Sequence, residues 1–236
     1  MSLPDDLQCR LVTLEEELRV EGWDPTPAEM IDWLARELRP ANELPARLEL
    51  AARLWAFGTQ DARILAAKLL TQARMRPDDA IWAALTGWIA ELGAGAEEWA
   101  LIESVSRALD RRIEAAPERL AEITPWVSHE NAALRAAFAL VARPNLRLKM
   151  PKAADLARRD ELLVLLAPLA ADRDQMVQRA LASALRDLAK HDAPRATTFL
   201  LAHGNAMVPW ARRESIGRLP IALDDRGRIT GAPDNH

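Results

Sequence analysis

From residue 42 onwards, helix-length segments alternate with short breaks, and this alternation limits the fold more than any other feature. Each segment has apolar residues at helical spacing, and the breaks contain Gly, Pro, Ser, Asp or Asn. Helix pairs that recur about every 30–45 residues are typical of a helical solenoid. The predicted helices cover residues 43–57, 60–74, 78–92, 96–113, 117–127, 130–142, 153–170, 174–190, 193–203 and 207–219.

Two more amphipathic helices are predicted before this region, at residues 7–21 and 26–38. The second begins with a capping-box pattern, in which Thr26 is the N-cap, Pro27 follows, and Glu29 lies three residues after the cap. We therefore expect three parts: a helical hairpin at 1–41 that caps the solenoid, a HEAT-like repeat domain at 42–219, and an extended or partly disordered tail at 220–236.

The composition agrees with an all-α fold. The chain has no Tyr, only three Phe and no long alternating run of Val, Ile and Thr, so the evidence for strands is weak. Half of its 236 residues are hydrophobic, which is enough for a large core. We predict a curved α-α superhelix, while a plain globular helix bundle fits the same periodicity and stays open as the alternative.

Several functional classes are disfavoured. Cys9 is the single cysteine, so no internal disulfide and no cysteine-based zinc site are expected. His129, His191 and His203 have no metal-binding spacing, and the glycines match no nucleotide-binding loop. The N-terminus lacks the pattern of a signal peptide, and no uncharged stretch is long enough for a membrane span. We expect a cytoplasmic protein without metal, cofactor or membrane partner.

The net charge of −4 hides an asymmetry along the chain. Residues 1–118 contain 13 Lys/Arg and 22 Asp/Glu, for a net charge of −9, whereas residues 119–236 contain 18 and 13, for +5. A basic surface in the second half would attract phosphates even though the whole chain is acidic. Ordinary surface charge on helices explains the same numbers and stays open.

In a solenoid of helix pairs, one helix of each pair lines the inner side of the curve. The polar faces of the expected inner helices, and the basic linker at 143–159, carry cations suited to a phosphate backbone. For the linker, a solvated loop is an equal alternative. The candidate DNA-binding residues are Arg63, Arg107, Arg111, Arg143, Arg147, Lys149, Arg179, Arg186, Lys190, Arg212 and Arg213.

Five segments, in this order, resemble segments of the AlkD-like DNA alkylation repair family. Members of that family are DNA glycosylases built from HEAT-like repeats. The resemblance spans roughly residues 42–219, and the order and spacing of the segments carry it. The segments are LWAFGTQDARILAAKLL (54–70), WALIESVSRAL (99–109), WVSHENAALRAAFAL (126–140), DRDQMVQRALASALRDLAKHDAPRATTFL (172–200) and ARRESIGRL (211–219).

This resemblance implies that the protein excises N3- or N7-alkylated purines from duplex DNA without a metal or organic cofactor. The family's aromatic residue corresponds to Trp99, its carboxylate to Glu103 and its arginine to Arg135. The carboxylate would stabilise positive charge that develops on the sugar, the tryptophan would contact the cationic base, and the arginine would hold the DNA backbone.

Each of these roles has a structural alternative. Trp99 fills a groove between helices in the simpler interpretation, and Glu103 forms an ordinary i,i+4 pair with Arg107. Arg135 stands on an apolar helix, where it either contacts phosphate or extends to solvent. Arg179 and Arg186 either follow a DNA strand or pair with Asp187 or Asp172.

The sequence departs from the family pattern in four places. Glu103 stands where an aspartate is usual, and Ser183 stands where a second aromatic residue is usual. Ala133 and Ala136 replace a tryptophan and an arginine. Two hypotheses therefore stay open: a DNA glycosylase, or a helical-repeat module that binds DNA or a protein and has lost excision.

Overall fold

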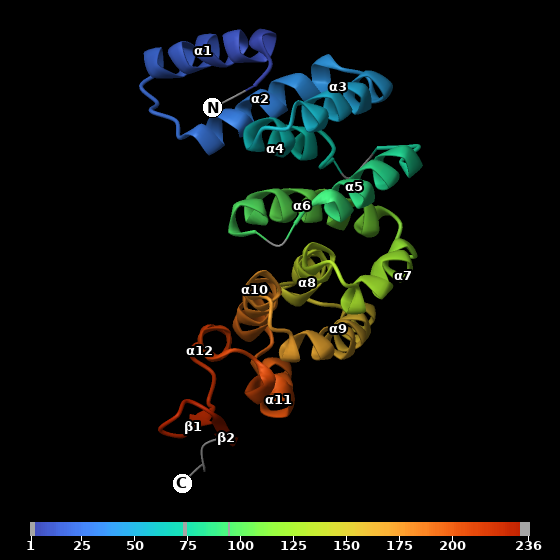
Figure 1. The fold of residues 1–236 in the computed structure, drawn as a ribbon. Coiled ribbons are helices and arrows are strands. Elements are labelled where there is room, and N and C mark those ends of the chain that lie inside the picture. Colours follow the sequence, from blue (N-terminus) through green and yellow to red (C-terminus); the bar gives the residue numbers. More distant parts are fainter. Residues whose placement is uncertain (1–2, 73–74, 94, 232–236) are drawn as a thin grey trace. The chain divides into compact units, whose positions relative to one another are not determined.

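The computed structural model describes residues 3–72, 75–93 and 95–231, and these residues are mostly α-helical (Figure 1). The prediction of an all-α fold is therefore confirmed. The described α-helices are α1 (Asp5–Val20), α2 (Pro27–Ala41), α3 (Leu44–Phe57), α4 (Gln60–Leu69), α5 (Asp79–Glu91), α6 (Trp99–Ala115), α7 (Arg119–Ile123), α8 (Ala132–Leu146), α9 (Ala153–Leu166), α10 (Gln175–His191), α11 (Ala193–His203) and α12 (Pro209–Ile216).

Four short 3-10 helices and two short strands complete the described elements. The 3-10 helices are η1 (Ala96–Glu98), η2 (Thr124–Ser128), η3 (Ala167–Ala171) and η4 (Gly204–Ala206), and the strands are β1 (Ala222–Leu223) and β2 (Ile229–Gly231). Every predicted helix has an observed counterpart, with ends that differ by a few residues. The last two residues of the helix predicted at 60–74 lie outside the described residues.

The chain divides into two compact units. Unit 1 consists of Met1–Trp88 and Ala100–Pro117, and unit 2 consists of Ile89–Trp99 and Glu118–His236. Most of α5 belongs to unit 1, as does α6 after its first residue, Trp99.

Helix ends in unit 1 follow local sequence signals. Thr26 and Glu29 form the predicted capping box at the start of α2: the Glu29 backbone N–H donates to Thr26 Oγ1 at 3.4 Å, and the Thr26 N–H donates to Glu29 Oε2 at 2.8 Å. Gly58 ends α3 with a φ of 89°, a left-handed conformation that glycine adopts without steric cost. Thr59 then caps α4, so a two-residue connection lets α3 and α4 pack together.

The core of unit 1 contains both stacked rings and a buried ion pair. The rings of Trp55 and Trp88 are stacked, with centroids 4.5 Å apart and planes 6° from parallel. Arg112 is fully buried, its Nη1 lies 3.7 Å from Asp78 Oδ2, and it donates to the Met75 carbonyl at 3.4 Å. The Asp78 carboxylate therefore balances a charge that would otherwise be costly to bury.

In unit 2, two ion pairs connect α8 with α10. Arg135, near the start of α8, pairs with Asp172, just before α10, whereas Arg143, near the end of α8, pairs with Asp187, near the end of α10. The two helices therefore run in the same direction, and α9 returns the chain between them. This arrangement is what successive helix pairs of a repeat protein produce.

The C-terminal region adds a small antiparallel hairpin to unit 2. Strands β1 and β2 pair with each other, and the Asn205 side chain accepts from the Ile229 N–H at 2.8 Å and donates to the Ile229 carbonyl at 2.9 Å. The sequence predicts an extended or partly disordered tail from Pro220. In the structure, Ile229 is 8% exposed and lies against η4, and residues 232–236 lie outside the described part, so the domain boundary at Pro220 stays a prediction.

The predicted boundary after residue 41 stays a prediction. Helix α2 packs against α1 and also against α4, which lies beyond that boundary. Across the described ranges 3–72, 75–93 and 95–231, no helix combines the length and the apolar character that crossing a membrane would need.

Candidate functional site

Trp99 and Arg179 form a cation–π contact within unit 2. Trp99 is the first residue of α6, directly after η1, and its side chain is half-buried. Arg179 lies on the second turn of α10, is exposed, and holds its Cζ 4.1 Å from the centroid of the Trp99 ring. At an exposed position such a contact is worth about 0.5–1 kcal/mol. The structure thus brings together two residues that the sequence assigned to different helices of one site.

A pocket of about 450 Å³ surrounds this contact. Trp210, at the second position of α12, lines it, and its side chain is 37% exposed. Sequence reasoning did not identify this role, since a tryptophan on a helix usually packs between helices. Aromatic and cationic groups therefore share one concave surface, which is lined by Ala96, Trp99, Arg173, Asp174, Gln175, Met176, Arg179 and Trp210.

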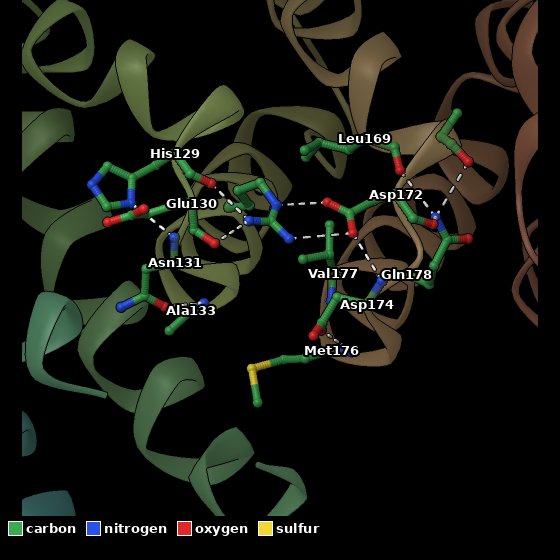
Figure 2. A network of polar contacts seen from close by, with 12 residues as sticks. His129, Glu130, Asn131, Ala133, Leu169, Asp172, Asp174, Met176, Val177 and Gln178 are labelled. Atoms are coloured by element: carbon green, nitrogen blue, oxygen red, sulfur yellow. Dashed lines mark hydrogen bonds and ion pairs between the residues drawn. The ribbon is translucent and has the colours of Figure 1, made fainter. Parts of the chain in front are cut away.

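The start of α10, which forms one side of the pocket, is held by two aspartates. Asp174 is the N-cap, and its Oδ1 accepts from the N–H groups of Met176 at 2.8 Å and Val177 at 3.3 Å. Asp172 Oδ1 accepts from the Asp174 N–H at 2.8 Å. Figure 2 shows these bonds.

The buried Gln178 side chain also holds the start of α10, through hydrogen bonds to the segment that precedes the helix. Its Nε2 donates to the carbonyls of Leu169 at 3.0 Å and Asp172 at 3.0 Å (Figure 2). Its Oε1 accepts from the Val208 N–H at 3.1 Å, next to the start of α12. One side chain therefore connects η3, α10 and the approach to α12, so the walls of the pocket carrying Arg179 and Trp210 are tied together.

Arg135 is bound to protein groups on several sides. Its Nε donates to Asp172 Oδ2 at 2.6 Å, and its Nη1 donates to the carbonyls of His129 at 2.6 Å and Glu130 at 2.7 Å. Figure 2 shows this network between the loop before α8 and the loop before α10. The Arg135 side chain therefore holds the loop before α8 and the loop before α10 together. A direct contact between Arg135 and DNA stays a prediction.

Asn131 holds the start of α8. Its Oδ1 accepts from the Ala133 N–H at 2.8 Å, which caps the helix (Figure 2), and its Nδ2 donates to the carbonyls of Ala90 at 3.2 Å and Leu92 at 3.1 Å. Asn131 is not among the predicted site residues, although a helix that begins one residue after an asparagine carries a recognisable N-cap signal.

Glu103 lies in a groove of unit 1, on the turn of α6 that follows Trp99. The groove has a volume of about 710 Å³ and mixed charge: Asp32, Asp61 and Glu103 are acidic, and Arg36, Arg39, Lys68 and Arg107 are basic. Lys68 forms an ion pair with Asp32. Burial lowers the pKa of the Arg39 guanidinium, which donates to the Ala35 carbonyl at 3.0 Å. The half-buried Glu103 carboxylate thus lies in a groove lined by both acidic and basic side chains.

Several predicted DNA-binding arginines are engaged with protein groups. Arg63 covers the Trp55 ring at 5.0 Å, and Arg111 pairs with Glu114 at 2.7 Å. In unit 2, two more predicted arginines have carboxylate partners, namely Arg143 with Asp187 at 2.9 Å and Arg186 with Glu214.

Arg212 differs from the other predicted DNA-binding residues in its burial. The residue is only 4% exposed, on α12, which packs against α10 and α11, and its contact with DNA stays a prediction that this burial does not favour. The predicted residues that are exposed and have no described ion pair are Arg107, Arg147, Lys149, Arg179, Lys190 and Arg213.

Three of the four positions that depart from the family pattern are buried, whereas the fourth, Glu103, is half-buried. Ser183 on α10 is 7% exposed, and its Oγ accepts from Arg186 Nη2 at 3.3 Å. Ala133 and Ala136 on α8 are fully buried. Small side chains at these three positions therefore belong to the packing of α8 and α10, the two helices whose contact is most extensive in unit 2.

As for metals, the side chains of residues 3–72, 75–93 and 95–231 form no cluster of three or more His, Cys, Asp or Glu suited to an ion.

Comparison with known proteins identifies the family. No curated protein matches the chain. A sequence model of the family described as DNA alkylation repair enzyme matches residues 27–219, which include both grooves and the residues of the Arg135 network. The resemblance carried by the five segments is therefore confirmed. Because the match covers well over half of the 236 residues, the chain belongs to the DNA alkylation repair enzyme family.

Proposed function

We propose that this member of the family binds duplex DNA carrying an N3- or N7-alkylated purine and releases the base by hydrolysis of its glycosidic bond. The observation that carries the proposal is the Trp99–Arg179 contact inside a pocket that Trp210 also lines. Aromatic faces attract flat cations, and an alkylated purine is a flat cation. A DNA repair role also supports a cytoplasmic location, which is part of this proposal.

The proposed reaction needs little from the protein beyond charge stabilisation. The bond between C1′ and the purine nitrogen breaks, the bonding electrons leave with the base, and the positively charged base departs neutral. Positive charge develops on the sugar, and water adds its oxygen to C1′ while releasing a proton. A carboxylate near the sugar stabilises the developing charge, and we propose Glu103 for this role.

The four-residue spacing of Trp99 and Glu103 along α6 supports this assignment. The longer glutamate side chain differs from the family's usual aspartate by one methylene. A displacement of about 1 Å in a catalytic group costs up to about a hundredfold in rate. We therefore expect slow excision compared with relatives that carry aspartate.

A second candidate function is DNA binding without excision. The specific observation that favours it is the burial of Ser183, which leaves the family's second aromatic position without a ring. Under this alternative, the exposed cations hold the backbone and the pocket recognises a damaged base without cleavage, or the same surface binds a protein.

Single-turnover release of free base distinguishes the two functions. The substrate is duplex DNA with one N7-methylguanine, and the variants are Glu103→Gln and Trp99→Leu. The glycosylase proposal predicts release by the wild type that falls by about a hundredfold or more in Glu103→Gln. Glu97→Gln is the matched control, since Glu97 is an exposed glutamate in η1, close in sequence to Trp99.

If the wild type releases no base, the binding candidate remains and is tested by salt dependence. Each phosphate contact releases counterions, so the logarithm of the binding constant falls with the logarithm of salt concentration. The double variant Arg147→Gln, Lys149→Gln removes two exposed cations of the loop between α8 and α9. It should lower the slope by about 2, and a response that is flat in the wild type would exclude DNA as the partner.

A further inference from the structure

We propose that Arg179 covers the Trp99 ring in the free protein and that binding of duplex DNA uncovers it. The inference rests on the proposed function of the pocket and adds a specificity-determining residue to it. The Arg179 guanidinium lies 4.1 Å above the ring centroid, which is where a flat cationic base would stack. A base and a guanidinium cannot occupy the same ring face at once.

The covering contact is weak enough to be displaced. Arg179 is exposed, and within the described residues its only specific partner is the Trp99 ring. The aspartates on and just before α10 have other partners: Asp174 caps the helix, Asp172 pairs with Arg135 and Asp187 pairs with Arg143. A single exposed cation–π contact holds the side chain, in contrast to the several bonds that hold Arg135.

Phosphate is a stronger partner than the ring for an arginine. A guanidinium binds two phosphate oxygens in a fork, and this charge-assisted geometry is stronger than an exposed cation–π contact. A DNA backbone close to α10 would therefore draw Arg179 away from Trp99. The same movement exposes the face of the Trp99 ring when bound DNA brings a damaged base close to it.

This arrangement makes free cationic bases poor ligands. An isolated alkylated nucleoside must displace Arg179 without offering it a backbone phosphate, whereas the same base in DNA arrives with one. A ligand shifts a two-state equilibrium only by its difference in affinity for the two states. Duplex DNA binds the uncovered state more tightly, because its phosphate binds the displaced Arg179. For a nucleoside, the free energy lost when Arg179 leaves the ring is not offset by a phosphate contact.

The test uses one variant and two ligands, with opposite expected effects. Calorimetric titration of Arg179→Ala with 7-methylguanosine should show about two- to fivefold tighter binding than the wild type, because the ring is permanently uncovered. Duplex DNA should bind the same variant more weakly, with a salt slope reduced by about 1, because one phosphate contact is lost.

Arg173→Ala is the matched control, since Arg173 is an exposed arginine that lines the same pocket. If Arg173→Ala tightens nucleoside binding as much as Arg179→Ala does, general charge repulsion explains the effect. That result would refute the proposal that Arg179 covers the Trp99 ring. The cover is also refuted if Arg179→Ala binds 7-methylguanosine no more tightly than the wild type, or if duplex binding does not change.

These measurements are independent of excision. All of them can be repeated in the Glu103→Gln background, where base release is expected to be slow and the contact of Arg179 with the Trp99 ring should be unchanged. Absence of base release in the wild type would contradict the proposed glycosylase while leaving the opposite effects on the two ligands as a separate result.

Discussion

Arg135 and Asp172 join the start of α8 to the start of α10. Arg135 Nε lies 2.6 Å from Asp172 Oδ2, and the two side chains are 17% and 11% exposed. The same guanidinium donates to the carbonyls of His129 and Glu130 (Figure 2). One side chain thus fixes two loops, and a change at Arg135 must be judged for its effect on the fold before any effect on DNA is assigned to it.

We predict that Arg135→Gln and Asp172→Asn both lower the free energy of unfolding by about 2 kcal/mol, since hydrogen bonds to charged groups are worth roughly 1.5–3 kcal/mol. Chemical denaturation measures this loss, and affinity for duplex DNA should fall similarly in both variants. Glu214→Gln is the control, because its pair with Arg186 is more exposed and should contribute less than about 1 kcal/mol. A loss of DNA binding in Arg135→Gln alone would instead support the direct phosphate contact.

The fold was largely predictable because local signals coincide with the helix ends. The Thr26–Glu29 capping box and the left-handed Gly58 are short-range features, and both are visible in the sequence. The C-terminal hairpin was not predicted, because its order depends on Asn205, which binds Ile229 from 24 residues away. Such a contact leaves no periodic signal in the sequence.

The candidate site was less predictable than the fold. Spacing placed Trp99 and Glu103 on one helix, but it did not show that Arg179 would cover Trp99 or that Trp210 would line the same pocket. Nor does helical periodicity separate an exposed arginine from a buried one at a helix contact, as Arg212 shows. These relationships depend on how helices pack, which a single sequence does not specify.

The buried ion pair between Arg159 and Asp192 gives a second prediction. Arg159 is fully buried, and its Nη1 donates to Asp192 Oδ2 at 2.9 Å. Asp192→Asn keeps an N-cap for α11 but leaves a buried cation without its counter-charge, so we expect a loss of about 3 kcal/mol in unfolding free energy. Asp160→Asn is the control, because Asp160 pairs with Arg195 at the surface and should cost less than about 1 kcal/mol. Equal losses in the two variants would contradict this ranking.

Acid should destabilise the protein through these carboxylates. Burial opposes ionisation of Asp192, but hydrogen bonds from Arg159 and Arg195 outweigh it and hold its pKa below the ordinary 3.8. The hydrogen bond from Arg195 likewise lowers the pKa of Asp160. A carboxyl whose pKa is lower in the folded state stabilises the fold above its unfolded pKa, and this contribution is lost as pH falls through the folded pKa.

The melting temperature should therefore begin to fall as pH drops below about 4, the unfolded pKa of Asp. Asp192→Asn should show a smaller fall over the same range than the wild type, since one of the responsible groups no longer titrates. Thermal melts at a series of pH values measure both curves. Parallel curves for the two proteins would show that Asp192 does not contribute to acid sensitivity.

Ser183 gives the last prediction, because it stands where the family usually has an aromatic ring. Its side chain is 7% exposed on α10, which packs against α8 and α12. A tryptophan there must displace packed neighbours, and overpacking of this kind costs about 1–3 kcal/mol. Ser183→Trp should therefore lower stability without increasing base release or DNA affinity, while Ser183→Ala should change stability by less than about 1 kcal/mol. Were Ser183→Trp to keep its stability and release base faster than the wild type, the position would have room for a stacking platform, and the excision site would include this turn of α10.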